Sequence, residues 1–597
     1  MDSDLKKYKD ISSHSSMSSL QLSPQTSAKP KMNYRLISKS KGLVVLPKEI
    51  NNELYQILKA RLNSHTQILV KELSFTFVLP KPKQTFKPVI NLLKNEKCLM
   101  SFKSSFPLQD SSQLAQAIST LKSSLYITSL ALQIDSHDLS NESFKSFSLK
   151  LRTLKNISDL GLHFLESQKI SSKGFQILFS SLSCLRSLSN LSLGFPFSDQ
   201  INDLDLRFIS LKLKLLGLQS LTLNFAQCEH ITDKGLQSLS EGLSSLKNLK
   251  VLEMDFSYMY KQITNEGVLG IFVGLGQVSS LNSLSLSLDY SELTKISDRE
   301  PLSIGLMQLI PAKIKKLSLR CYKYFSDIDA SKFLDSLKHF DGLVNLNLGV
   351  DCSYYQFFGH GFKGHWKSLQ CFSLLSSLTL NFSTCVKLDN EILETLAEGI
   401  SQCKNLTQLS LNFSRCKNIT DGGVENLSKS LEVLRGLLQV CLDFGSCEKI
   451  TDNGVRVLCE RLKEMENLGY LQLIFLRCKS VTNHAVQEIG GMIKRLRKLE
   501  YLHLTMAYCR QVNDEAIQTL AVNLKHLMSL TSLILNFRQC EVSGERSMRS
   551  FFGMLENMKG LKSLILHFPS FSGELEVKMR LLQILRFTKI YITFHET

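Results

Sequence analysis

The sequence has no long apolar run, which limits where the protein can reside. Within its 597 residues, no stretch approaches the ~18 consecutive apolar residues that a membrane helix requires. The first ten residues, MDSDLKKYKD, also lack the apolar core of a secretory signal. We therefore expect a soluble protein with no membrane partner, located in the cytoplasm, with the nucleus as an alternative.

Proline and paired cysteines are also scarce. Only 11 prolines interrupt the chain, so long disordered tracts are not expected beyond the N-terminus. The 15 cysteines include no C-x-x-C pair, and no histidine stands at metal-ligand spacing from the repeated ones. Without a secretory signal, reduced thiols are the expected state. The sequence predicts no metal, no cofactor and no disulfide framework.

Positive charge is concentrated at the start of the chain. The net charge is +17, of which residues 1–103 carry +11 and the other 494 residues carry +6. Such a basic segment attracts acidic partners, although a solvated tail with surface lysines would look the same. Because no groove-reading motif accompanies the charge, nucleic acid is not the expected partner.

A repeated pattern fills nearly everything after residue 70. The stretch LNFSRCKNITD at 411–421 returns in related form through the second half of the chain. The central leucines of seven successive units are spaced 31 residues apart, at Leu380, Leu411, Leu442, Leu473, Leu504, Leu535 and Leu566. With looser units upstream, degenerate ones at Phe75 and Met100 and a last one at Ile592, the total is about 18.

Each unit combines a strand pattern with a helix pattern. The segment L-x-L-x-F alternates with period two, as a short half-buried strand does. Apolar residues at helical spacing follow, and Thr232, Thr420 and Thr451 stand just ahead of them as N-caps. No single unit could bury its apolar side alone, so neighbouring units must stack. We predict one α/β solenoid of horseshoe shape, with parallel strands on the concave side and helices on the convex side.

One cysteine recurs at a fixed place in the unit. The members of this ladder are Cys228, Cys385, Cys416, Cys447, Cys478, Cys509 and Cys540. A group that recurs in every unit is not a single catalytic centre, and small apolar cysteines are common in cores. We interpret the ladder as structural.

The full motif, L-x-x-L-x-L-x-F-x-x-C-x-x-I-T-D-x-G, appears at residues 218–235 and 406–423. It resembles the leucine-rich repeat family, in particular its ribonuclease-inhibitor-like and cysteine-containing branches. The resemblance implies a solenoid used for protein recognition, and it implies no catalytic residue. We therefore expect a protein that is not an enzyme, is monomeric by itself and acts as an interaction scaffold or adaptor.

The sequence before the repeats divides into two parts. Residues 1–40 form a basic, Ser-rich segment whose composition predicts disorder. Residues 41–70 predict a helical cap, and residues 71–597 form the repeat domain. Residues 46–62 of the cap also resemble the opening helix of an F-box. That resemblance implies an alternative function as a substrate receptor of a ubiquitin ligase.

Residues between the core leucines should face the concave surface. Those singled out as candidate ligands are Asn224, Asp255, Arg320, Asn381, Asn412, Asp443 and Asn536. The asparagines could equally do no more than satisfy neighbouring repeats. A third function, stoichiometric regulation of a small enzyme held inside the horseshoe, would depend on Asp255, Asp443 or Arg320.

The most irregular unit, 351–377, is rich in aromatic residues. It lacks the cysteine and the capping pattern, and it contains the chain's only tryptophan. Aromatic clusters are typical interface anchors, although the same residues could be buried in a repacked repeat. The candidate partner-binding residues here are Tyr354, Tyr355, Phe357, His360, His365 and Trp366.

Overall fold

A computed structural model describes most of the repeat region. The described residues are 72–76, 101–107, 127–135, 140–165, 169–259, 263–288, 301–310, 313–321, 327–350, 364–542, 544–569 and 589–595. The predicted tail (1–40), the helical cap (41–70) and the F-box-like segment (46–62) lie outside these residues.

The strands form one parallel sheet of 18 strands. Each strand pairs in parallel with the strand of the next repeat, from β1–β2 through β17–β18. Their bounds are β1 Glu72–Thr76, β2 Ser101–Pro107, β3 Ser129–Asp135, β4 Asp159–Leu165, β5 Asn190–Gly194, β6 Ser220–Asn224, β7 Val251–Asp255, β8 Ser283–Ser287, β9 Lys316–Cys321, β10 Asn345–Val350, β11 Ser377–Asn381, β12 Gln408–Asn412, β13 Gln439–Asp443, β14 Tyr470–Ile474, β15 Tyr501–Thr505, β16 Ser532–Asn536, β17 Ser563–Pro569 and β18 Lys589–His595.

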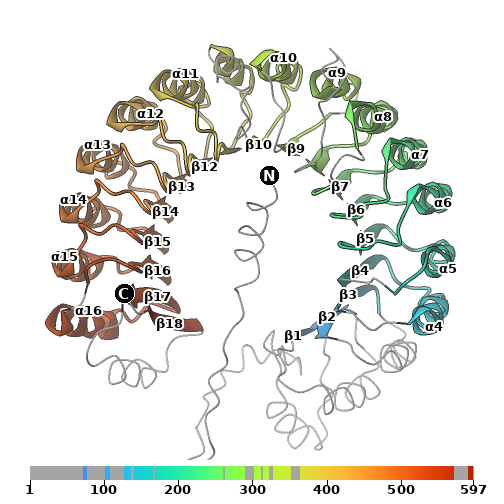
Figure 1. Cartoon of the computed structure of the whole chain (residues 1–597), viewed down its shortest axis with the longest axis horizontal. Coiled ribbons are helices and arrows are strands. Elements are labelled where there is room, and N and C mark those ends of the chain that lie inside the picture. Colours follow the sequence, from blue (N-terminus) through green and yellow to red (C-terminus); the bar gives the residue numbers. More distant parts are fainter. Residues whose placement is uncertain are drawn as a thin grey trace, which may run out of the picture.

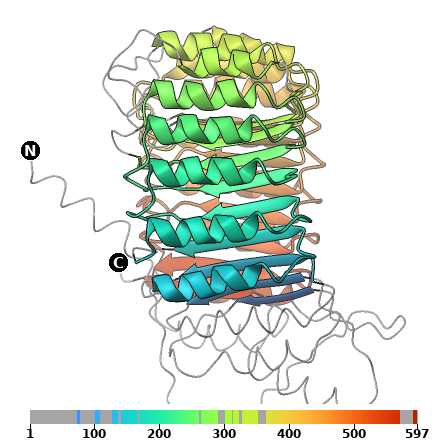
Figure 2. The same cartoon turned by 90° about the vertical axis from the view of Figure 1, so that its right-hand side faces the viewer.

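A helix follows most of these strands and crosses to the outer side. The helices are α4 Asn141–Leu151, α5 Ser172–Leu182, α6 Asp203–Leu213, α7 Asp233–Leu243, α8 Asn265–Leu275, α9 Pro301–Gln308, α10 Asp327–Leu337, α11 Asn390–Ser401, α12 Asp421–Val433, α13 Asp452–Leu462, α14 Asn483–Ile493, α15 Asp514–Leu524 and α16 Glu545–Asn557, with a 3₁₀ helix, η2, at His365–Cys371. Strands line the inside of an open arc and helices form its outer ring (Figure 1). Successive repeats stack one above the other (Figure 2). The predicted α/β horseshoe is confirmed.

We divide the arc into two arms. The N-terminal arm runs from β4 to β8 and the C-terminal arm from β11 to β17, with η2 just before the second. No helix in the described ranges is long and apolar enough to cross a membrane.

The predicted register of the central leucines is largely correct. Leu380 pairs with Leu411, Leu411 with Leu442, and the last unit is centred on Ile592, which pairs with Leu566. Phe75 also stands at the central position, but its partner in β2 is Ser104 rather than Met100. The sequence placed that unit four residues early, because β2 carries serines where other strands carry leucines.

Phenylalanines extend the core beyond the strand ends. In the C-terminal arm Phe382, Phe413, Phe444 and Phe475 stack with ring centroids 5.6–5.9 Å apart, and Phe195, Phe225 and Phe256 stack likewise in the N-terminal arm. Each ring is fully buried. The rings pack in the offset stacking that aromatic quadrupoles favour, so part of each arm has an aromatic seam beside its leucines.

The Thr-Asp pair both caps a helix and joins two repeats. The hydroxyl of Thr451 accepts a hydrogen bond from the Asn453 N–H as the N-cap of α13, and Thr232 and Thr420 cap α7 and α12 as predicted. The Thr451 N–H and Oγ1 also donate to both carboxylate oxygens of Asp421 in the preceding repeat, at 2.8 and 2.6 Å. A Cβ on Gly454 would lie 2.5 Å from Asp421 Oδ1. This contact explains why glycine ends the motif T-D-x-G.

Candidate partner-binding surface

The predicted concave ligands at the strand ends are occupied in turns. The side-chain oxygen of each accepts a hydrogen bond from the backbone N–H two residues later, at 2.8–3.2 Å, in the Asx turns that these short side chains form. The residues are Asn224, Asp255, Asn381, Asn412, Asp443 and Asn536. Arg320 stands apart, because its side chain is exposed on β9. These side-chain oxygens therefore satisfy donors in their own repeat, whereas the sequence suggested that the asparagines could serve the neighbouring repeats.

The turns themselves depend on a left-handed residue. Gln227, Thr384, Arg415, Ser446, Arg477, Tyr508 and Gln539 all have positive φ between 58° and 69°. For example, the Arg477 N–H donates to the Ala507 carbonyl of the next repeat at 2.9 Å. Non-glycine residues rarely hold this conformation, and here the hydrogen bonds from turn to turn stabilise it.

All seven cysteines of the ladder are buried directly after this left-handed residue. Cys447 Sγ donates to the Phe413 carbonyl at 3.1 Å, and Cys416, Cys478, Cys509 and Cys540 make the corresponding bond at 3.1–3.2 Å. Burial raises the pKa of the Cys447 thiol to about 12. At neutral pH these sulfurs are protonated hydrogen-bond donors in the core, and they are poor nucleophiles.

The aromatic segment divides into described and undescribed residues. Tyr354, Tyr355, Phe357 and His360 lie outside the described residues. Trp366 is fully buried, and its ring meets that of Phe382 edge-on at 5.6 Å. Trp366 therefore belongs to the core, which corrects its prediction as a surface anchor.

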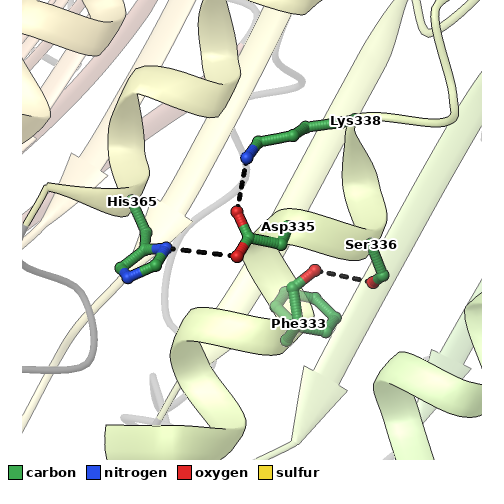
Figure 3. A network of polar contacts seen from close by, with 5 residues as sticks. All are labelled: Phe333, Asp335, Ser336, Lys338 and His365. Atoms are coloured by element: carbon green, nitrogen blue, oxygen red, sulfur yellow. Dashed lines mark hydrogen bonds and ion pairs between the residues drawn. The ribbon is translucent and has the colours of Figure 1, made fainter.

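His365 makes an ion-pair contact between η2 and α10 (Figure 3). Its Nδ1 lies 3.4 Å from Asp335 Oδ2, and Lys338 Nζ lies 2.5 Å from Asp335 Oδ1. Burial raises the pKa of Asp335, but the hydrogen bonds and charges of Lys338 and His365 outweigh it and leave that pKa below its ordinary value. His365 thus helps to fasten η2 to α10.

A different group of large side chains gathers on the concave face of β14–β17. We call this group the concave cluster, and it consists of Tyr470, Gln472, Ile474, Tyr501, His503, Ile534, Ile565 and His567. Tyr470 and Tyr501 are register partners whose rings stack with centroids 4.0 Å apart. Gln472, His503, Ile534 and Ile565 form the next row across the four strands.

The concave cluster is half-buried and uncharged at its centre. All eight side chains are of intermediate exposure. Burial lowers the pKa of His503, and the nearby His567 lowers it further. Burial raises the pKa of Tyr470, and Tyr501 adds to that effect. Both groups are therefore neutral at physiological pH, and the cluster offers apolar area with a few polar tips.

Some strands of the N-terminal arm carry only small side chains at the same positions. In β5, β6 and β8, for instance, the inward residues are serine, threonine, asparagine or glycine. The concave candidates predicted from the sequence lie between or after the leucines, whereas Tyr470 and Tyr501 stand at the position before the first leucine. The signal was present in YLQLI and YLHLT, because a period of two places that residue on the same face.

Comparisons with known proteins give the following matches. Residues 217–240 and 402–428 match the family model described as Leucine Rich repeat. No curated protein matches the sequence. Among solved structures, the chain is similar to one from the yeast Rad7–Elc1 complex, with 19% identity over 75% of this chain and 92% of that chain and a TM-score of 0.43. It is also similar to one from the TLR13–ssRNA13 complex, with 14% identity, coverage of 79% and 59%, and a TM-score of 0.37. Likenesses this loose carry no argument about function.

Proposed function

We propose that this chain, a leucine-rich-repeat protein, is a non-enzymatic scaffold that binds a partner protein through the concave cluster. The observation that carries the proposal is the stacked pair Tyr470–Tyr501 on the concave face, at a position where β5 and β6 carry Asn190 and Ser220. Tyrosine is enriched at the centres of protein interfaces, because it combines apolar area with a polar tip.

The arrangement is suited to binding because it is already ordered. The stacking holds both rings in one geometry, so little side-chain freedom remains to be lost on association. Ile534 pairs with His503 in the row next to the tyrosines, and Ile474 lies one row farther along the strands, beside Thr505. Together these side chains form a platform that a partner's apolar residue can cover, while Gln472 and the histidines within it supply hydrogen bonds.

The test is affinity purification of the tagged full chain, followed by measurement of the affinity for each recovered protein. Tyr470→Ala with Tyr501→Ala should weaken binding by roughly 30-fold or more, since one interface anchor contributes about 2 kcal/mol. The matched control is Ser220→Ala with Val251→Ala, at the same strand positions of β6 and β7 in the N-terminal arm. Thermal melts check that both variants fold.

The results separate the remaining alternatives. Equal binding by both double variants would overturn the concave cluster as the site. Loss of a partner on removal of residues 1–70 would favour the F-box-like interpretation. A recovered enzyme whose activity changes on stoichiometric binding would identify a regulator. We also propose that the protein is monomeric and cytoplasmic, the latter in keeping with the free thiols of the twelve cysteines whose side chains are described.

A further inference from the structure

A strongly basic hollow lies at the outer edge of the C-terminal arm. It occupies about 440 Å³ between the loops that follow α14 and α15. Its lining residues are Lys494, Arg495, Arg497, Lys525, His526 and Met528. All six are exposed.

The cations of this hollow are not neutralised within the described part of the chain. No carboxylate lines the hollow, and none of its side chains takes part in the ion pairs of the described residues. Four permanent positive charges therefore line one hollow, and like charges repel one another. An anionic occupant would relieve that repulsion.

A second hollow in the same arm shows that the fold does not require this charge. It lies between the loops after α12 and α13 and is lined by Glu432, Arg435, Glu460, Arg461, Lys463 and Glu464, with two apolar residues. Three cations there face three carboxylates, and Arg461 pairs with Glu432 at 3.3 Å. The equivalent position in the repeat thus accepts a balanced set of charges.

Helix dipoles account for only part of the basic character. Lys494 and Lys525 are the C-caps of α14 and α15, where a cation stabilises the negative end of a helix. Arg495 and Arg497 lie beyond the helix end, and neither interacts with a carboxylate in the described ranges. Their guanidinium groups have the fork geometry that binds carboxylates in a bidentate manner.

Apolar groups border the cations. Met528 is 82% exposed, and Val522 on α15 is 57% exposed. Methionine adapts its shape readily to an apolar partner. The hollow has no Phe, Tyr or Trp in its lining, and Glu464 and Glu466 occupy the preceding loop. A nucleic-acid backbone favours a longer positive track and aromatic platforms, so these features favour a peptide.

We propose that this hollow binds an acidic segment of a partner protein, with carboxylates on Arg495 and Arg497 and an apolar side chain on Met528. The occupant is not the N-terminal part of this chain, because residues 1–103 carry a net charge of +11 and would be repelled. The proposal is independent of the concave cluster, because no residue of that cluster lines the hollow.

The test measures binding of a labelled, glutamate-rich peptide with one central leucine to the full chain by fluorescence anisotropy. Arg495→Glu with Arg497→Glu should weaken binding on the order of tenfold, since it replaces attraction by repulsion at two sites. The control is Arg435→Glu with Lys463→Glu in the balanced hollow, which should change the affinity little. The basic N-terminal residues contribute equally in every variant, so only differences between variants count.

Two further measurements distinguish a peptide site from charge alone. Met528→Ser should weaken the leucine peptide several-fold and leave a serine-substituted peptide unchanged. Equal loss in the two double variants, or no loss in either, would overturn the proposal. So would tighter, Arg495- and Arg497-dependent binding of a single-stranded oligonucleotide or of phosphatidylserine vesicles. Thermal melts of each variant confirm that the chain remains folded.

Discussion

The N-terminal and C-terminal arms have the same repeating backbone, but different atoms fill the space beneath their turns. In the C-terminal arm a cysteine stands there in six consecutive repeats, from Cys385 to Cys540. In the N-terminal arm the same place holds Ser198, Cys228 and Met259 in turn, all of them buried. The comparison shows that the turn tolerates buried side chains of different size. Of the two arms, the C-terminal one repeats the same residue type at this position.

The hydrogen bonds beneath the turn explain why a cysteine is favoured there. Six of the ladder thiols, from Cys228 and from Cys416 to Cys540, reach a carbonyl of the preceding repeat at 3.1–3.2 Å. The hydroxyl of Ser198, by contrast, has no hydrogen-bond partner in the described part of the chain. A C–O bond is shorter than a C–S bond, so a hydroxyl on the same backbone stops short of that carbonyl. The arms therefore differ in how well one buried polar group is satisfied.

The largest effect is expected just before the second arm begins. Trp366→Ala should lower the free energy of unfolding by about 3–5 kcal/mol, because it removes a fully buried aromatic ring and leaves a cavity. Urea unfolding followed by circular dichroism measures this. Lys367→Ala is the control, since Lys367 is exposed and its contact with Glu398 contributes little. Unchanged stability with loss of a partner would restore Trp366 as a surface anchor.

A smaller loss is expected within the regular ladder. Cys447→Ser should cost about 1–3 kcal/mol, because the hydroxyl would be buried without reaching the Phe413 carbonyl. The same urea experiment measures it. Cys441→Ser on the half-exposed concave face provides the comparison and should be nearly neutral. If both serine variants were equally stable, the hydrogen bond to the carbonyl would contribute nothing.

The reverse change tests the irregular arm. Ser198→Cys should raise the free energy of unfolding by about 1 kcal/mol, because a thiol can form the bond that the hydroxyl does not. A rise in the melting temperature under reducing conditions is the expected readout. A fall would show that the two arms differ in backbone geometry at this turn as well as in side chain.

The smallest effect concerns one charge in the row of strand-end asparagines. Burial raises the pKa of Asp443, with the Gly445 N–H partly opposing it. Above the folded-state pKa both states are ionised, so the native protein bears the cost of a buried carboxylate. As the pH falls through that pKa, the native state takes up the proton first and the cost disappears.

Asp443→Asn should therefore stabilise the protein by less than about 1 kcal/mol at neutral pH, and the gain should shrink as the pH is lowered. Melting temperatures across a pH series measure both. The reciprocal change, Asn412→Asp, places a second carboxylate on the neighbouring strand and should destabilise. A gain for Asp443→Asn that did not vary with pH would contradict the stated cause.

The sequence predicted features that depend on a single repeat better than those that depend on two. Leucine spacing indicated the strands, and the Thr-Asp pairs marked the helix starts, because periodicity and capping are local properties. The burial of Trp366 was missed because its environment comes from the next repeat, through Phe382. The role of Asn412 as a turn acceptor was left open for a related reason. An asparagine at this position has the same sequence pattern whether its side chain faces a ligand or accepts a hydrogen bond in an Asx turn.

The bonds between Thr451 and Asp421, and their equivalents along each arm, also have a mechanical consequence. Each bond joins only adjacent repeats, so any bending of an arm is distributed over many similar junctions between repeats. A slight rotation at every junction adds up to a large displacement at the mouth of the arc. The width of that opening can therefore adjust to objects of different size while each single contact changes very little.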